Sequence, residues 1–176
     1  MRIRRLPALL ALAVMLTASA ASAAGANGPS RAVGGGSFLF VGVTPNIPMQ
    51  FSFSAVGHED GSASGSFHHF YEDGGFTYEF WGTLTCVTFA TVDAENRRAW
   101  IGGVLTKVSS TDPDVGLAAG DDAWFRVLDS TDGDRSTAMG FVGAIESSEA
   151  YCALQIWPDD NARTHPVTEG QIKVAI

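Results

Sequence analysis

The sequence predicts an all-β protein, a single small antiparallel β-barrel of about eight strands, with a two-sheet β-sandwich as the alternative. Short runs rich in Phe, Val, Thr, Ile and Trp alternate with turn residues, and stretches with a helical period are nearly absent. The chain has 176 residues, of which 45% are hydrophobic, enough for the core of one domain. A closed barrel is favoured because closure removes the exposed edges that an open meander would leave.

Residues 1–23 have the order of a secretory signal peptide. Three arginines precede an apolar run over residues 6–16, and small residues follow up to Ala23, after which cleavage is expected. The apolar run is shorter than the roughly 20 residues that a membrane-spanning helix needs. We therefore expect a secreted or extracytoplasmic protein, with no membrane insertion once the signal peptide has been cleaved.

Beyond this leader, residues 24–36 are expected to form a flexible Gly-rich segment and residues 37–176 a single β domain. The whole chain carries a net charge of −8, and without the three leader arginines eight basic residues remain against nineteen acidic ones, a charge of −11. Such a surface lacks the cations that neutralise phosphates. Nucleic acid and anionic membrane surfaces are therefore not expected partners.

Alternating apolar residues predict the first strands and their registers. One strand is expected over residues 37–43. A three-residue loop at Glu59-Asp60-Gly61 then joins two strands, and a four-residue loop over residues 72–75 joins the next pair. Both loops keep apolar side chains on one face. The expected pairs are Met49 with Tyr71, Phe51 with His69, Phe53 with Phe67, Phe67 with Phe80, His69 with Tyr78, and Tyr71 with Phe76.

A third loop over residues 93–96 is expected to extend this apolar face into one more strand. The opposite face, which is polar elsewhere, becomes apolar at Val87, Phe89 and Trp100. Something must therefore cover one side of this hairpin, and this stretch is what favours the sandwich alternative. The expected pairs are Leu84 with Leu105, Cys86 with Gly103, Thr88 with Ile101, and Ala90 with Ala99.

Four further strands are expected downstream. The first covers residues 123–128, and the last alternates through Ile172, Val174 and Ile176. Between them, an inward set from Met139 to Ile145 is expected to turn near residues 147–148 and pair with the segment 150–156. That segment also contains good helix formers, so a short helix after Ser148 is the alternative.

Cys86 and Cys152 are the two cysteines of the chain, and an even pair in an exported protein is expected to form one disulfide. Because it closes a long loop, this bond would stabilise the fold by about 4 kcal/mol in the chain-entropy model. Two separate buried thiols are the alternative. The lack of a Cys-x-x-Cys spacing argues against redox catalysis.

One part of the chain carries a recognisable pattern, the run Gly82-Thr83-Leu84-Thr85-Cys86-Val87 followed by Asn96, Ala99 and Ile101-Gly102-Gly103-Val104. It resembles a pattern of uncharacterised secreted bacterial β-rich proteins, G-x-V-x-C-V and then G-N-x-A-x-I-G-G-x-V. The closing segment, residues 166–174, is similar to the end of such chains. The resemblance implies export, β structure and the cysteine pairing, and it implies no activity.

His69 is the most informative candidate for a binding site, because it falls on the aromatic face between Phe51 and Tyr78. If that face lines an incompletely filled barrel, it forms an apolar pocket with two polar handles, suited to a small hydrophobic ligand. The alternative is that these side chains fill the core and His69 is simply buried. The candidate ligand-binding residues are Phe51, Phe53, Phe67, His69, Tyr71, Tyr78 and Phe80.

The sequence offers few metal ligands. His68 and His69 are neighbours on a strand and point to opposite faces, so they cannot bind one ion together. Acidic turns can coordinate Ca²⁺, and the candidate ligands are Asp129, Asp132 and Asp134. Solvated turn residues are the alternative interpretation of this run. No other cofactor is expected.

The sequence shows no motif of an enzyme: no nucleophile elbow, zinc-protease helix or phosphate loop. Nearly all acids lie in turns, and Glu79, on the polar face, has no visible partner for paired-carboxylate chemistry. We therefore expect an exported non-catalytic β domain with a structural or interaction-mediating role. A carrier barrel for a small hydrophobic ligand and a hydrolase with an unrecognised site are the alternatives.

Overall fold

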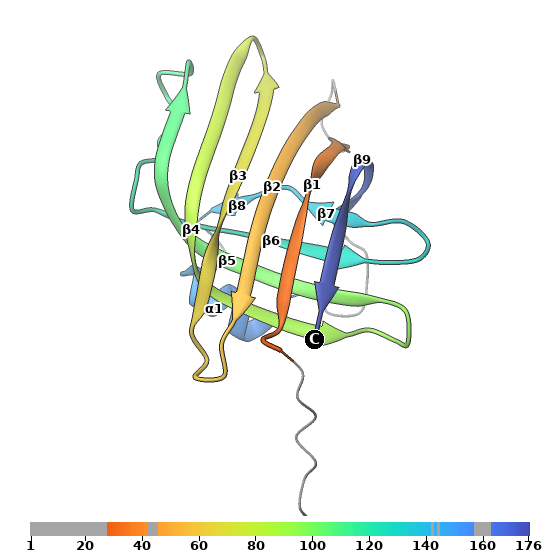
Figure 1. Ribbon diagram of the computed structural model, residues 1–176. Helices are drawn as coiled ribbons and strands as arrows, with labels where there is room; N and C mark the ends of the chain where they lie inside the picture. Colours follow the sequence, from red (N-terminus) through yellow and green to blue (C-terminus); the bar gives the residue numbers. More distant parts are fainter. Residues whose placement is uncertain (1–27, 42–45, 142, 144, 157–162) are drawn as a thin grey trace, which may run out of the picture.

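The chain forms a closed antiparallel barrel of eight strands, with one extra strand and one short helix (Figure 1). The computed structural model describes residues 28–41, 46–141, 143, 145–156 and 163–176. Strands account for 64% of these residues. The predicted β-barrel is therefore confirmed, and the sandwich alternative is wrong. The expected signal peptide, residues 1–23, lies outside the described residues.

Nine strands and the helix follow one another along the chain. The first five strands are β1 (Arg31–Phe40), β2 (Ile47–Gly57), β3 (Ala63–Asp73), β4 (Phe76–Thr91) and β5 (Arg97–Ser110). The remaining elements are β6 (Asp122–Asp129), β7 (Arg135–Thr137), β8 (Gly140–Phe141), α1 (Ser148–Leu154) and β9 (Thr164–Ala175).

Most strands pair with their neighbours in sequence. From β1 to β7, each strand pairs with the next one in sequence. β9 pairs with both β7 and β1, which closes the ring. β8 pairs with one end of β6, outside the ring. β1 begins at Arg31 rather than at the expected Ser37, because the three glycines over residues 34–36 pair with both β2 and β9.

The first hairpin has the predicted register, and the second is shifted. In β2 and β3, Phe53 lies opposite Phe67, as predicted from the loop that ends at Gly61 (φ 84°). In β3 and β4 the chain turns through Gly74 and Gly75 alone, a shorter loop than predicted. The shift is an even number of residues, so the same side chains still face inward. The observed pairs are Tyr71 with Tyr78, His69 with Phe80, and Phe67 with Gly82.

Gly82 leaves the space that the Phe67 ring occupies. A Cβ at position 82 would lie 2.0 Å from Phe67 Cζ, far inside van der Waals contact. Because the ring is held in a packed core, we expect Gly82→Ala to lower the free energy of unfolding by roughly 2 kcal/mol, measured by urea denaturation. Gly28→Ala is the control, because no described atom lies within 4 Å of a Cβ there. Equal stability of both variants would contradict this role for Gly82.

The third hairpin departs from the predicted register at its loop and again at a β-bulge in β4. The pairing changes between Leu84 and Cys86, which lie opposite Gly103 and Gly102, so Thr85 is an extra residue. Beyond the bulge the strand presents its other face, so Val87 and Phe89 pack against the barrel core. Cys86 then lies on the outside. The predicted pairs of β4 and β5 are wrong because the loop is one residue longer than predicted, which sets Ala90 opposite Arg98, and because the bulge then shifts the pairing by one more residue. The inward position predicted for Cys86 is wrong as well.

The outer face of the barrel at β4, β5 and β6 is covered by α1, which packs against all three strands. The predicted strand over residues 150–156 is wrong, and the alternative, a short helix after Ser148, is confirmed. The Ser147 side chain caps the helix by accepting a hydrogen bond from the Ala150 amide (3.2 Å). The helix hides the outward face of β5 and β6, where Trp100 and Trp124 are almost fully buried against Tyr151.

Candidate functional site

The predicted aromatic face lies inside the barrel and is packed. His69 is fully buried, and its ring centroid lies 4.9 Å from that of Phe125 in β6 and 6.2 Å from that of Phe51. Phe67 also packs on it, edge to face. Rings therefore fill the interior at this position. Of the predicted ligand-binding residues, Phe51, Phe53, Phe67, His69 and Phe80 are buried, while Tyr71 and Tyr78 are partly buried.

The two tyrosines lie at one end of this face. Their rings stack with centroids 4.7 Å apart, and the Tyr78 hydroxyl donates a 2.7 Å hydrogen bond to Asp112 Oδ2. That hydrogen bond, with a smaller contribution from burial, raises the pKa of Tyr78 to about 12. The Tyr78 hydroxyl, expected to be a polar handle for a ligand, is therefore engaged by a loop carboxylate.

The imidazole of His69 is a polar group in the packed interior. Within the described part of the chain, neither ring nitrogen of His69 has a hydrogen-bond partner. Burial, and to a smaller extent the nearby charge of His68, lower the pKa of His69 to about 3. His69 is therefore neutral at physiological pH.

An open pocket of about 640 Å³ lies elsewhere, on the side of the barrel next to α1. It forms where the wall splits, because β7 pairs with one half of β6 and β8 with the other half. The short link between β7 and β8, the ends of β1 and β9, and the helix surround the opening. The described lining residues are Phe40, Val41, Trp124, Thr137, Ala138, Met139, Gly140, Phe141, Ile145, Tyr151, Ile156, Arg163 and His165.

Most of the pocket wall is apolar and rigidly supported. The ring of Trp124 stacks on that of Tyr151 with centroids 5.7 Å apart. Gly140 lies so close to this indole that a Cβ would be 2.5 Å from Trp124 Nε1. Burial raises the pKa of the Tyr151 phenol, which therefore stays neutral. This side of the pocket offers a flat aromatic surface.

Two lining residues with nitrogen-containing side chains, Arg163 and His165, come from the start of β9. His165 is 5% exposed and its ring stacks on Phe38 with centroids 5.6 Å apart. No described residue forms a hydrogen bond with its Nδ1. Burial, and then the charge of Arg135, lower the pKa of His165, so the imidazole is neutral at physiological pH. Arg163 lies two residues earlier, exposed, with a left-handed backbone (φ 62°).

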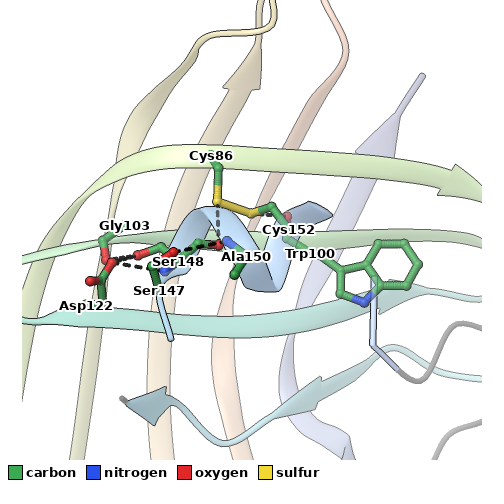
Figure 2. The surroundings of a disulfide bond; sticks show 8 residues. All are labelled: Cys86, Trp100, Gly103, Asp122, Ser147, Ser148, Ala150 and Cys152. Carbon is green, nitrogen blue, oxygen red and sulfur yellow. Dashed lines mark hydrogen bonds between the residues drawn. A yellow bond between two sulfur atoms is a disulfide. The ribbon is translucent and has the colours of Figure 1, made fainter. Parts of the chain in front are cut away.

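The helix wall of the pocket is fastened to the barrel by covalent and polar contacts (Figure 2). The predicted disulfide joins Cys86 in β4 to Cys152 in α1. The Ser148 hydroxyl donates to the Gly103 carbonyl (2.7 Å) and also contacts Asp122. The Asp122 carboxylate accepts the Ser148 amide as well (3.0 Å). These contacts hold Tyr151 in place against Trp124.

The acidic turn predicted to bind Ca²⁺ is directed toward the backbone of β9. Asp129 Oδ2 accepts the Val174 amide (2.9 Å), and Asp134 Oδ2 accepts the Ile172 amide (2.6 Å). Asp132 lies exposed in the turn. Among the residues that the structure describes, no three His, Cys, Asp or Glu side chains lie close enough to hold a metal ion. Asp129 and Asp134 thus help to close the barrel.

Two histidines lie outside the core. His68 points outward, opposite to His69 as predicted, and its Nε2 lies 2.8 Å from Glu79 Oε1. Glu79 therefore has a partner that sequence analysis missed, although His68 lies diagonally across the β3–β4 pairing from it. His58 Nε2 lies 2.8 Å from Ser64 Oγ at the hairpin end.

In the described ranges, no helix has the length and apolar character to cross a membrane.

Comparisons with known proteins leave function to be inferred from this site alone. No protein-family model, curated protein or solved structure matches the chain. The pocket itself had no sequence signal, because its walls come from six elements, β1 and each element from β6 to β9, none of which carries a recognisable motif. The helical alternative after Ser148 was the one hint that an element outside the barrel would help to build a site.

Proposed function

We propose that this protein is an exported, non-catalytic β-barrel that binds a small, mainly apolar ligand in the pocket between the barrel wall and α1. The observation that carries the proposal is the pocket itself: about 640 Å³, lined largely by apolar and aromatic side chains. Ligand sites are typically concave, apolar and of 300–1,000 Å³ or so, with few polar groups.

The character of the lining supports binding rather than catalysis. The Thr137 hydroxyl, a conceivable nucleophile, already accepts a hydrogen bond from the Arg126 amide (3.0 Å). Nucleophilic catalysis needs a base within hydrogen-bond reach of the nucleophile. The candidate base, the neutral and buried His165, is stacked on Phe38, where it can contact a ligand. The aromatic pair Trp124 and Tyr151 supplies contact area without reactive groups.

Two features support export. Residues 1–23 have the charged, apolar and small-residue order of a signal peptide. The disulfide between Cys86 and Cys152 is of the kind that forms and persists in oxidising compartments. Because the bond also holds one wall of the pocket, an exported setting suits the proposed binding function.

The test is saturable binding of a neutral hydrophobic naphthylamine dye to the mature protein, followed by fluorescence. We expect one site per molecule and, in an Ala138→Trp variant whose indole occupies the pocket, affinity weaker by at least about tenfold. Val92→Trp is the matched control, because Val92 is exposed on the β4–β5 loop, away from the pocket. The proposal fails if the dye does not saturate, or if it binds both variants equally well.

A further inference from the structure

We propose that the ligand of this pocket carries a neutral carbonyl oxygen, which accepts a hydrogen bond from the indole N–H of Trp124. This inference rests on the proposed function and gives the chemical class of its ligand, an apolar ketone, ester or amide. It is carried by an indole nitrogen without a partner among the described residues, by its place in the pocket wall, and by the charges that reach that wall.

The indole of Trp124 is a nearly buried hydrogen-bond donor. Trp124 is 6% exposed, and no described residue accepts a hydrogen bond from its Nε1. Trp100, the other indole of the same cluster, donates from Nε1 to the Ile156 carbonyl (2.9 Å). Buried indole N–H groups usually find such a partner. A donor that lacks one is unfavourable, and a ligand oxygen would remove that cost.

The Trp124 nitrogen can be reached from the pocket. Trp124 belongs to the lining, and its Nε1, unlike the ring nitrogens of His69, is not sealed off by the surrounding atoms. Gly140 lies opposite Trp124 in β8 and also lines the pocket. A Cβ at position 140 would lie 2.5 Å from Nε1, so glycine leaves room beside this nitrogen. Because the indole also stacks on Tyr151, the donor is held in place before a ligand binds.

The charges around the pocket favour a neutral acceptor over a carboxylate. The described lining contains no Asp or Glu, and the guanidinium of Arg163 already has an interaction partner. Arg126, 1% exposed, donates from Nη1 to the Ile156 carbonyl (3.4 Å), and its positive charge acts on Tyr151. This wall is therefore electropositive while its cations are engaged, which suits the partial negative charge of a carbonyl oxygen. A carboxylate would lose its hydration without gaining an ion pair.

The experiment compares two competitors for the naphthylamine dye, acetylnaphthalene and isopropenylnaphthalene, because they have the same shape and differ in the replacement of the carbonyl oxygen by a methylene group. Trp124→Phe removes the indole N–H and keeps an aromatic ring against Tyr151. We expect the ratio of the ketone's affinity to the hydrocarbon's to fall about fivefold in this variant, the magnitude of one neutral hydrogen bond. The ratio cancels losses of affinity that the two compounds share.

Trp81→Phe is the matched control, because it makes the same substitution outside the described lining. Trp81 stacks on the outward-pointing His68, with ring centroids 5.0 Å apart. This variant should keep the wild-type ratio. Naphthoate is the third competitor for the wild type, since it presents a carboxylate on the same ring system, and it should bind more weakly than the ketone.

A measurement on the wild type makes the test independent of the folding of Trp124→Phe. The chain has four tryptophans, whose indole N–H signals can be followed by nitrogen–proton correlation NMR. We expect the Trp124 signal to lie at lower field with the ketone bound than with the hydrocarbon bound, because the N–H then donates to an oxygen.

The outcomes separate the two proposals. The inference is overturned, while the proposed function stands, if Trp124→Phe keeps the wild-type affinity ratio, if naphthoate competes best, or if the Trp124 signal is the same with both compounds. If the dye itself does not bind saturably, the proposed function fails and this inference fails with it.

Discussion

A Cys86→Ala/Cys152→Ala variant of the mature protein is expected to lose about 4 kcal/mol of unfolding free energy relative to the oxidised wild type. The bond links residues 66 positions apart, and in the chain-entropy model a cross-link over so long a loop strongly restricts the unfolded chain. The measurement is denaturation by guanidinium chloride at equilibrium. A loss of this size is a large fraction of the stability of a typical domain.

The effect should also be visible at the pocket. With seven residues, α1 is too short to be stable as an isolated helix, so its place depends on tertiary contacts. Releasing Cys152 leaves the polar contacts of Ser148 to hold Tyr151 against Trp124, and dye binding should weaken in the double variant. Wild type reduced with dithiothreitol is the control, and it should show the same loss of stability. Losses below about 1 kcal/mol in both samples would contradict the chain-entropy explanation.

Strand registers were predictable where the sequence combined an alternating aromatic face with one acceptable turn. Gly61 supplies the left-handed residue that the first loop needs, so the register that pairs Phe53 with Phe67 was correct. In the next hairpin, Gly74 and Gly75 allowed a tighter turn than predicted. The error changed the pairs and left the inward face unchanged, because a shift of two residues preserves side-chain direction.

The bulge at Thr85 could not be predicted, because its cause lies in a distant part of the chain. Alternation alone placed Leu84 and Cys86 on one face. The disulfide with α1 instead requires Cys86 outside the barrel, while Leu84 stays in the core. An extra residue between them satisfies both demands. The apolar side chains of Val87 and Phe89, on a face that is polar elsewhere, are the trace of this change in the sequence, but they do not locate the bulge.

The sequence also did not decide whether side chains fill the barrel interior or leave a cavity there. The position of His69 beside Phe51 was predicted from register alone, and whether a cavity lay there depended on the volumes of side chains from the far wall. Phe125, from β6, fills that space with its ring 4.9 Å from the imidazole. Eight-stranded barrels can be either filled or hollow, so this question needed the structure.

Buried His69 should make the protein acid-sensitive. Its pKa is about 3 in the folded protein, lowered from its ordinary 6.5 mainly by burial, so below about pH 6.5 the unfolded chain takes up a proton that the folded protein excludes. The stability present above that pH is therefore lost progressively as pH falls toward 3. Between about pH 7 and pH 4 we expect His69 to account for a loss of roughly 3 kcal/mol in unfolding free energy.

The variant that isolates this effect is His69→Leu, because leucine fills much of the same space without a titratable group. Its denaturation midpoint in urea should fall much less than that of the wild type between these two pH values. The comparison uses each protein as its own reference, so a change in packing at neutral pH does not affect it. His68→Gln is the matched control: the neighbouring side chain lies on the outer face, and the buried His69 remains. If His69→Leu loses as much unfolding free energy on acidification as His68→Gln does, protonation of His69 is not what destabilises the barrel.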